Sequence, residues 1–144
     1  MDNYTYILGP CSIENEENFL TVAKELSPLM EGKDWYLKGS FDKANRTSIH
    51  SDRGPGLEEG MEIMRTVKHY YPDIKIVTDI HEPSQALPLS EVVDVIQIPA
   101  FLCRQTDLLV ECAKNFNVIN IKKGQWLSAE SMKHAVTKIK DVDS

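Results

Sequence analysis

Residues 35–56 read WYLKGSFDKANRTSIHSDRGPG, and this stretch decides the fold expected for the chain. It opens as a short apolar strand, becomes polar within a few residues and closes on a Gly-Pro-Gly break. Its polar part holds four cations interleaved with hydroxyl and amide side chains, namely Lys38, Lys43, Arg46 and Arg53. Lysine offers a point charge and arginine a planar fork, and both suit phosphate or carboxylate oxygens. Taken alone, the segment is equally open to a second interpretation as a solvated connecting loop.

The same arrangement, an apolar strand with a polar end, recurs along the chain. Strands are expected at residues 4–8, 35–38, 74–77, 92–98 and 118–121. After each strand, apolar side chains at helical spacing predict a helix. Near-continuous apolar strands are typical of a parallel sheet that is covered by helices. The recurrence of polar strand ends therefore favours ligand binding over a connecting role for residues 38–56.

We expect an α/β fold of the (β/α)8 TIM-barrel type, with only the first five βα units present. In such barrels the functional groups gather at the C-terminal ends of all strands, whereas a doubly wound sheet concentrates them at one switch point. The sequence contains neither a Gly-x-Gly-x-x-Gly motif nor a P-loop. At about 29 residues per unit, eight units need roughly 250 residues. Residues 1–144 are therefore expected to form a single partial barrel domain.

Composition narrows the class of ligand. The chain has 144 residues, 42% of them hydrophobic, and a net charge of -6, which argues against nucleic acid as a partner. Seven of its 16 cations nevertheless lie at strand ends or in the loops after them. These are Lys38, Lys43, Arg46, Arg53, Arg104, Lys122 and Lys123. A basic pocket in an acidic protein indicates small anionic ligands.

Cysteine usage and hydropathy indicate a compartment. Cys11, Cys103 and Cys112 are odd in number and form no Cys-x-x-Cys pair, so we expect a reducing cytosol and no disulfide framework. Cys103 and Cys112 are interpreted as packing residues. No apolar run approaches the roughly 18 residues of a membrane span, and the N-terminus lacks the plan of a signal peptide. A cytoplasmic protein without membrane contact is expected.

Three sequence signatures are specific enough to indicate a family. They are ILGPC at residues 7–11, KGSFDKANRTSIH at 38–50 and QIPAFLCRQTD at 97–107. With them the chain resembles the 3-deoxy-D-manno-octulosonate 8-phosphate synthase (KDO-8-phosphate synthase) family, at least as far as Gln125. The resemblance implies condensation of phosphoenolpyruvate with D-arabinose 5-phosphate and water. The products are the eight-carbon sugar acid phosphate, which feeds lipopolysaccharide synthesis, and inorganic phosphate.

The resemblance also implies roles for individual residues. Those implied to bind phosphoenolpyruvate are Lys38, Ser40, Gln97, Arg104 and Lys122, with Lys123 a less certain neighbour. Those implied to bind arabinose 5-phosphate are Lys43, Asn45, Arg46, Thr47 and Phe101. The catalytic set is His81, Asn45 and Asp79, where His81 is either a general acid/base or a hydrogen-bonded wall residue. The family usually has serine in place of Thr47, and threonine keeps the hydroxyl.

Cys11 implies a metal. In this family the metal-dependent branch carries cysteine after Gly-Pro, and a thiolate suits a divalent Fe, Zn or Mn ion. Without the motif, Cys11 would read as a small buried apolar residue. The remaining ligands come from family segments beyond the five units found here, so we expect this chain to be the N-terminal part of the enzyme. The complete enzyme is expected to be a homo-oligomer, a tetramer.

Two alternatives stay open. A sister enzyme, DAHP synthase, joins phosphoenolpyruvate to erythrose 4-phosphate on the same fold. Its phosphate loop reads Lys-Pro-Arg-Thr, whereas residues 43–47 read KANRT, which argues against it. The other alternative is a non-catalytic remnant of a truncated barrel that binds ligands weakly or pairs with another chain through its open sheet edges.

Overall fold

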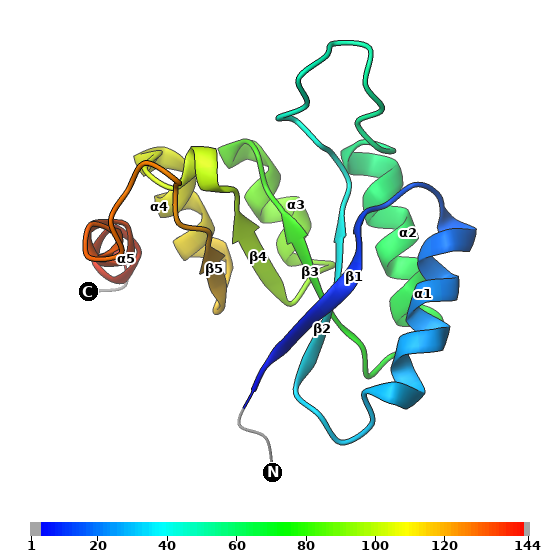
Figure 1. The fold of residues 1–144 in the computed structure, drawn as a ribbon. Coiled ribbons are helices and arrows are strands. Elements are labelled where there is room, and N and C mark those ends of the chain that lie inside the picture. The colour runs from blue at the N-terminus through cyan, green and yellow to red at the C-terminus, as the bar shows by residue number, and fades with distance from the viewer. Residues whose placement is uncertain (1–3, 143–144) are drawn as a thin grey trace. The chain divides into compact units, whose positions relative to one another are not determined.

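The computed structural model describes residues 4–142, which form strands alternating with helices (Figure 1). The chain divides into two compact units, Met1–Thr78 and Asp79–Ser144. The strands within each unit run parallel and follow one another in chain order. This confirms the α/β class and the repeated βα units of an incomplete barrel.

The first unit contains three strands and two long helices. In chain order they are β1 (Tyr6–Ser12), α1 (Glu16–Leu29), β2 (Trp35–Ser40), α2 (Leu57–Tyr70) and β3 (Lys75–Asp79), whose last residue belongs to the second unit. Leu8 of β1 is in register with Leu37 of β2, which in turn is in register with Ile76 of β3. Figure 1 shows α1 and α2 side by side against these strands.

Local sequence explains where the two helices begin. The Asn15 side chain accepts a hydrogen bond from the Asn18 main-chain N–H at 2.8 Å, and Glu16 and Glu17 occupy the first turn of α1. An amide cap and early carboxylates both stabilise a helix N-terminus. Helix α2 follows Gly56, whose φ of 86° suits a residue without a Cβ.

The core of the first unit lies between the strands and the two helices. Its fully buried side chains include Phe19 of α1, Leu37 of β2, Met64 and Val67 of α2, and Ile76 of β3. Gly39 of β2 lies against this core and leaves no room for a side chain. A Cβ there would lie 2.6 Å from the Phe19 ring and 2.8 Å from Ile13. The glycine thus lets α1 pack closely against the end of β2.

The second unit continues the βα alternation. It contains two short 3-10 turns, η1 (Pro83–Gln85) and η2 (Ala100–Leu102), together with α3 (Ala86–Ser90), β4 (Val95–Ile98), α4 (Thr106–Asn115), β5 (Ile119–Ile121) and α5 (Met132–Lys140). Ile80, Ile96, Ile98, Leu109 and Cys112 are fully buried and form its core. Cys103 is also fully buried, so both cysteines expected to be packing residues are confirmed as such.

The observed strands differ from the expected ranges at one end or both, and two boundaries differ by three residues or more. Strand β1 runs on through Gly9-Pro10-Cys11 to Ser12, with a register shift between Leu8 and Cys11. A Cβ at Gly9 would lie 2.0 Å from the Lys38 carbonyl oxygen, so the glycine permits this close pairing with β2. Strand β4 starts at Val95 and not at Val92, because the Val92 N–H donates to the Leu89 carbonyl and closes the turn after α3.

None of the helices formed by residues 4–142 combines the length and apolar character that crossing a membrane requires.

Replacing Gly39 with alanine is expected to destabilise the chain. The added Cβ must displace Phe19 and Ile13 from close contact, and overpacking of this kind costs about 1–3 kcal/mol. Urea unfolding followed by circular dichroism measures the change. As a control, Gly32→Asn places a side chain in open space at a φ of 73°, where asparagine is tolerated, and should cost less than about 1 kcal/mol. Equal effects of the two variants would contradict the packing assigned to Gly39.

Candidate functional site

The loop after β2 is closed at its base by hydrogen bonds and an ion pair. The Lys43 N–H donates to the Arg53 carbonyl at 2.7 Å, and the Gly56 N–H donates to the Phe41 carbonyl at 3.0 Å. The Arg53 guanidinium binds the Asp42 carboxylate through Nε at 2.8 Å and Nη2 at 2.5 Å. This bidentate contact raises the pKa of Arg53. Arg53 therefore clamps the base of the loop.

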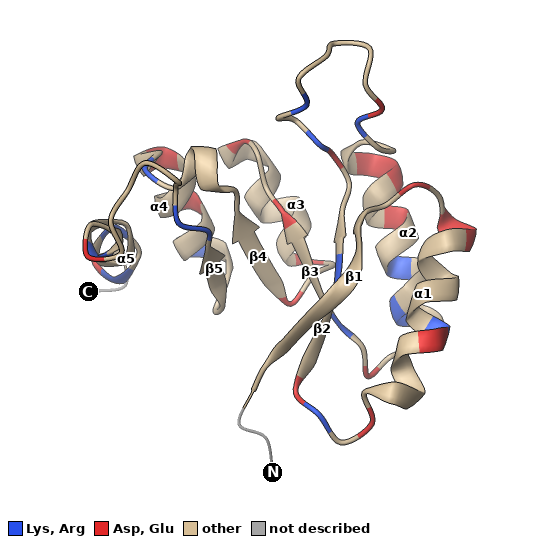
Figure 2. Ribbon diagram, in the orientation of Figure 1, with Lys and Arg blue, Asp and Glu red and all other residues tan. Residues whose placement is uncertain are grey.

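The tip of this loop carries the residues implied to bind the sugar phosphate. Asn45, Arg46 and Thr47 are all exposed, and Figure 2 shows basic positions along this loop. The Arg46 Nε donates to the Asp52 carbonyl at 3.3 Å, which ties the arginine back to the returning side of the loop. The structure thus brings the implied sugar-phosphate residues of the first unit together on one exposed loop.

Two residues at the end of β2 are buried. Lys38 is only 7% exposed and Ser40 is fully buried. The Ser40 hydroxyl donates to the Asp42 carbonyl at 2.7 Å, so its hydrogen is used to turn the chain into the loop. An anion at this point could use the charge of Lys38, whereas Ser40 shapes the start of the loop.

Cys11 lies beside this loop in an unusual backbone conformation. Its φ is 68°, it is exposed, and the Lys43 Nζ lies 3.1 Å from its sulfur. Residues 4–142 contain no group of three or more His, Cys, Asp or Glu side chains that could hold a metal ion. A single thiol next to an ammonium group does not make a metal site, so the residues described here do not fit the implied metal by themselves.

In the second unit, polar side chains at the end of β3 and on β4 and β5 are hydrogen-bonded to one another. The Gln97 Nε2 donates to Asp79 Oδ1 at 2.5 Å, and the Asn120 Nδ2 donates to Gln97 Oε1 at 2.8 Å. Gln97 is almost fully buried, and Asp79 and Asn120 are half-buried. Asp79 and Gln97 were predicted as site residues. Asn120 was not, although its place between the isoleucines of β5 was a visible signal.

His81 is fixed through its backbone. The main-chain N–H groups of His81 and Glu82 both donate to Gln85 Oε1, at 2.9 and 3.1 Å. The Glu82 side chain closes a reciprocal capping box with Gln85 at the start of η1. The half-buried His81 therefore lies just beyond the end of β3, with its main chain held by the Gln85 side chain.

Aromatic rings follow β4 and β5. Phe101 is 59% exposed, and its ring stacks on that of Trp126 with centroids 5.6 Å apart. Gly124 lies under the indole, since a Cβ there would be 3.0 Å from the Trp126 ring. Trp126 was not predicted as a site residue. The exposed stack offers an apolar surface beside the polar strand ends.

The two lysines after β5 have different surroundings. The Lys123 Nζ donates to the carbonyls of Gly124 and Leu127, both at 2.8 Å, and so clamps its own loop. Lys122 is exposed, and its main-chain N–H donates to the Ile98 carbonyl at 3.0 Å, which places it beside the end of β4. Arg104 is also exposed, and its carbonyl accepts from the Lys138 Nζ at 3.2 Å. Of the lysine pair, Lys122 is the one whose ammonium can meet a ligand.

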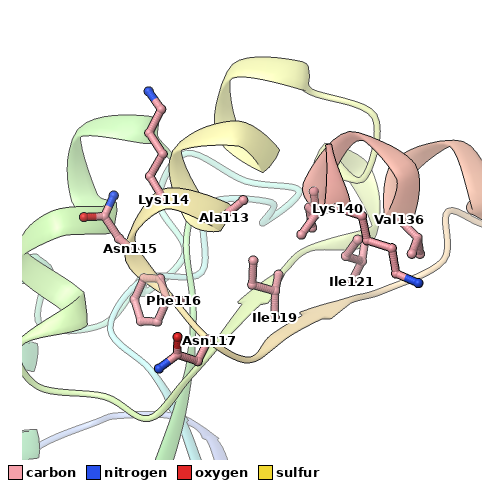
Figure 3. Close-up of a pocket in the computed structure, with 10 residues that line it drawn as sticks. Ala113, Lys114, Asn115, Phe116, Asn117, Ile119, Ile121, Val136 and Lys140 are labelled. Atoms are coloured by element: carbon pink, nitrogen blue, oxygen red, sulfur yellow. The ribbon is translucent and has the colours of Figure 1, made fainter. Parts of the chain in front are cut away.

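A cavity of about 460 Å³ in the second unit lies elsewhere (Figure 3). Its lining includes Ile119 and Ile121 of β5 and Val136 and Ile139 of α5. Successive strand residues point to opposite faces, so Asn120 points away from it. A second cavity, of about 620 Å³, lies in the first unit at the starts of β2 and β3, near Trp35 and Lys75. Neither cavity contains a predicted site residue.

Comparison with known proteins identifies the family. A model described as the DAHP synthetase I family matches residues 2–143. The chain belongs to this family. It is 55% identical over 141 residues to a protein of Campylobacter jejuni subsp. doylei, covering 96% of this chain and 52% of that protein. A Wolinella succinogenes protein is 53% identical over 134 residues, 92% of this chain and 51% of the relative.

A Helicobacter hepaticus protein is similar as well, at 55% identity over 132 residues, 90% of this chain and 48% of the relative. All three relatives are named 2-dehydro-3-deoxyphosphooctonate aldolase. The name refers to the same eight-carbon sugar acid phosphate that the three signatures indicated, so the family resemblance is confirmed. The chain spans about half the length of the curated relatives it matches.

The cysteines should differ in reactivity. Burial, with a smaller effect of Glu111, raises the pKa of the Cys112 thiol to about 12, while Cys11 is exposed. A thiol reagent at pH 8 is therefore expected to label Cys11 in the folded chain and Cys112 only after unfolding. Because the unfolded chain loses the Cys112 proton first, folding stability should fall between about pH 9 and pH 12. Peptide mass spectrometry checks the labelling, and rapid labelling of Cys112 in the folded chain would contradict its burial.

Proposed function

We propose that this chain is part of an enzyme that condenses phosphoenolpyruvate with D-arabinose 5-phosphate and water. The products are 3-deoxy-D-manno-octulosonate 8-phosphate and inorganic phosphate. The observation that carries the proposal is the 55% identity, over 141 residues, to a protein named 2-dehydro-3-deoxyphosphooctonate aldolase. The polar strand ends and the exposed basic loop support it, because both substrates are anions that need such donors.

The residues divide the binding between the two substrates. Lys38, Gln97, Arg104 and Lys122 supply donors and positive charge to phosphoenolpyruvate, as the family resemblance implies for each of them. The loop at residues 43–47 takes the phosphate of the sugar. Phe101 gives the sugar an apolar wall, and Ser40 shapes the start of the loop.

The proposed reaction forms one carbon–carbon bond. The nucleophilic carbon of phosphoenolpyruvate attacks the sugar aldehyde, water adds to the enol carbon, and phosphate leaves with carbon–oxygen cleavage. Holding two anions together and stabilising the developing charge account for most of the catalysis. Asp79, Asn45 and His81 are the groups that we propose to orient the aldehyde and move protons.

Several implied properties belong to the same proposal. A divalent Fe, Zn or Mn ion in the complete enzyme would take Cys11 as one ligand, with the others outside the residues described here. The cytoplasmic location and the homo-tetramer implied by the resemblance are also part of it.

A second candidate function is the DAHP synthase reaction with erythrose 4-phosphate. It is favoured by the description of the matching family model, which names DAHP synthetase. The KANRT sequence at residues 43–47 and the names of the relatives favour arabinose 5-phosphate. The third candidate is a non-catalytic role. It is tested as well, because the chain matches only about half the length of its relatives.

The proposal is tested by supplying the segment that the relatives have beyond this match. We define the joined protein as this chain followed by the C. jejuni relative's residues beyond the matched 141. With phosphoenolpyruvate and arabinose 5-phosphate, the joined protein is expected to release inorganic phosphate, and omission of either substrate should abolish the release. Turnover of phosphoenolpyruvate with erythrose 4-phosphate but not with arabinose 5-phosphate would overturn the assignment. A folded joined protein that is inactive with both sugars would favour the non-catalytic alternative.

A further inference from the structure

A chain of two hydrogen bonds links three polar side chains of the second unit. Asn120 donates to Gln97 at 2.8 Å, and Gln97 donates to Asp79 at 2.5 Å. Gln97 and Asn120 are register partners in the parallel pair of β4 and β5, so both side chains leave the sheet on the same face. The neighbours of Asn120, Ile119 and Ile121, line the cavity of Figure 3 on the other face.

This chain of hydrogen bonds has a direction. An amide side chain has one end that donates and one that accepts, whereas an ionised carboxylate only accepts. Asp79 therefore requires the NH2 end of Gln97, and Asn120 supplies a donor to the carbonyl end. If the Gln97 amide turned over, its oxygen would face the Asp79 carboxylate and its nitrogen would face the NH2 group of Asn120. The first contact would be repulsive, and the second would be repulsive unless the Asn120 amide turned over as well.

We propose that Asn120 is a positioning residue that holds the Gln97 amide with its NH2 group toward the anionic substrate. The NH2 group carries two hydrogens, and Asp79 takes one of them. The other is the donor that an anion needs. The identity of that anion as phosphoenolpyruvate rests on the proposed function. No role has been assigned to Asn120 by the sequence signatures.

Because the Gln97 side chain is buried, a reversed orientation of its amide would be energetically costly. Gln97 is only 6% exposed, so water cannot readily replace a lost partner of its amide. A buried acceptor without a donor is costly, and a buried amide therefore adopts the orientation that its neighbours dictate. The Asp79 carboxylate sets the orientation at the NH2 end, and Asn120, the register partner of Gln97 on the next strand, supplies the matching donor at the carbonyl end.

The direction can be reversed by two substitutions. Asn120→Asp replaces the donor by an acceptor and should lower the urea midpoint of the chain. Adding Asp79→Asn places an amide at the other end, so that a fully bonded chain running the opposite way becomes possible. The double variant is expected to recover at least half of the lost midpoint. Adding Asp79→Leu instead removes the same charge without supplying a donor, so it should not recover the midpoint if the reversed chain, and not simple charge repulsion, is the cause.

Asn117→Asp is the matched control for the stability measurement. It makes the same chemical change three positions earlier, at an exposed residue that lines the cavity of Figure 3. Its midpoint should stay at the value of the parent chain, and Asp79→Asn should not change its effect. Equal behaviour of the Asn117 and Asn120 variants, or the absence of coupling between positions 79 and 120, would overturn the directed chain.

Kinetics of the joined protein separate positioning from structural support. Asn120→Asp is expected to raise the KM for phosphoenolpyruvate about 10- to 100-fold, with a change of less than about 3-fold for arabinose 5-phosphate. Asp79 belongs to the proposed catalytic set, so for the variants that carry Asp79→Asn the Kd for phosphoenolpyruvate is measured by titration calorimetry. Asp79→Asn alone keeps the donor at Asn120 and serves as the reference for the double variant. Relative to that reference, the double variant should show a rise of about 10- to 100-fold in Kd although its stability has recovered.

A merely structural role predicts a different outcome, in which the double variant regains its stability and also binds phosphoenolpyruvate with the Kd of Asp79→Asn. That result would overturn the proposal. An inactive joined protein would instead overturn the proposed function, and the urea measurements on the chain would still decide whether Asn120 sets the direction of the Gln97 amide.

Discussion

Parallel strand pairing is the constraint on which the rest of this structure depends. Because β2 and β3 run the same way, as do β4 and β5, the polar ends of neighbouring strands fall at the same edge of each unit. In the second unit the pairing places Gln97 opposite Asn120, and in the first unit it places Leu37 opposite Ile76 within the buried core. Gly9 and Gly39 serve this constraint, since they allow β1 and α1 to approach β2 closely.

Much of the fold could be predicted from the sequence because its signals are local. Apolar runs with polar ends gave the strands, and helical spacing together with caps such as Asn15 gave the helices. The extension of β1 to Ser12 could not be predicted in this way. Gly9 and Pro10 argue locally against a strand, and only pairing with β2 across the register shift stabilises one there.

The predicted residues of the candidate site lie at strand ends or in the loops that follow them. Only the structure shows what each of their side chains contacts. Arg53 and Lys123 look like ligand-binding cations in the sequence, yet each binds groups of its own loop. Asn120 and Trp126 carried no motif, and their contacts with Gln97 and Phe101 arise between different strands and loops. Such contacts depend on register, which a linear pattern does not encode. The roles proposed for the predicted residues stand on the family resemblance.

We propose that this chain is part of an enzyme that forms an eight-carbon product from phosphoenolpyruvate and arabinose 5-phosphate. The most direct measurement is mass spectrometry of the product that the joined protein forms from phosphoenolpyruvate and an equimolar mixture of arabinose 5-phosphate and erythrose 4-phosphate. The account predicts the eight-carbon acid phosphate as the main product. A predominance of the seven-carbon product would contradict it.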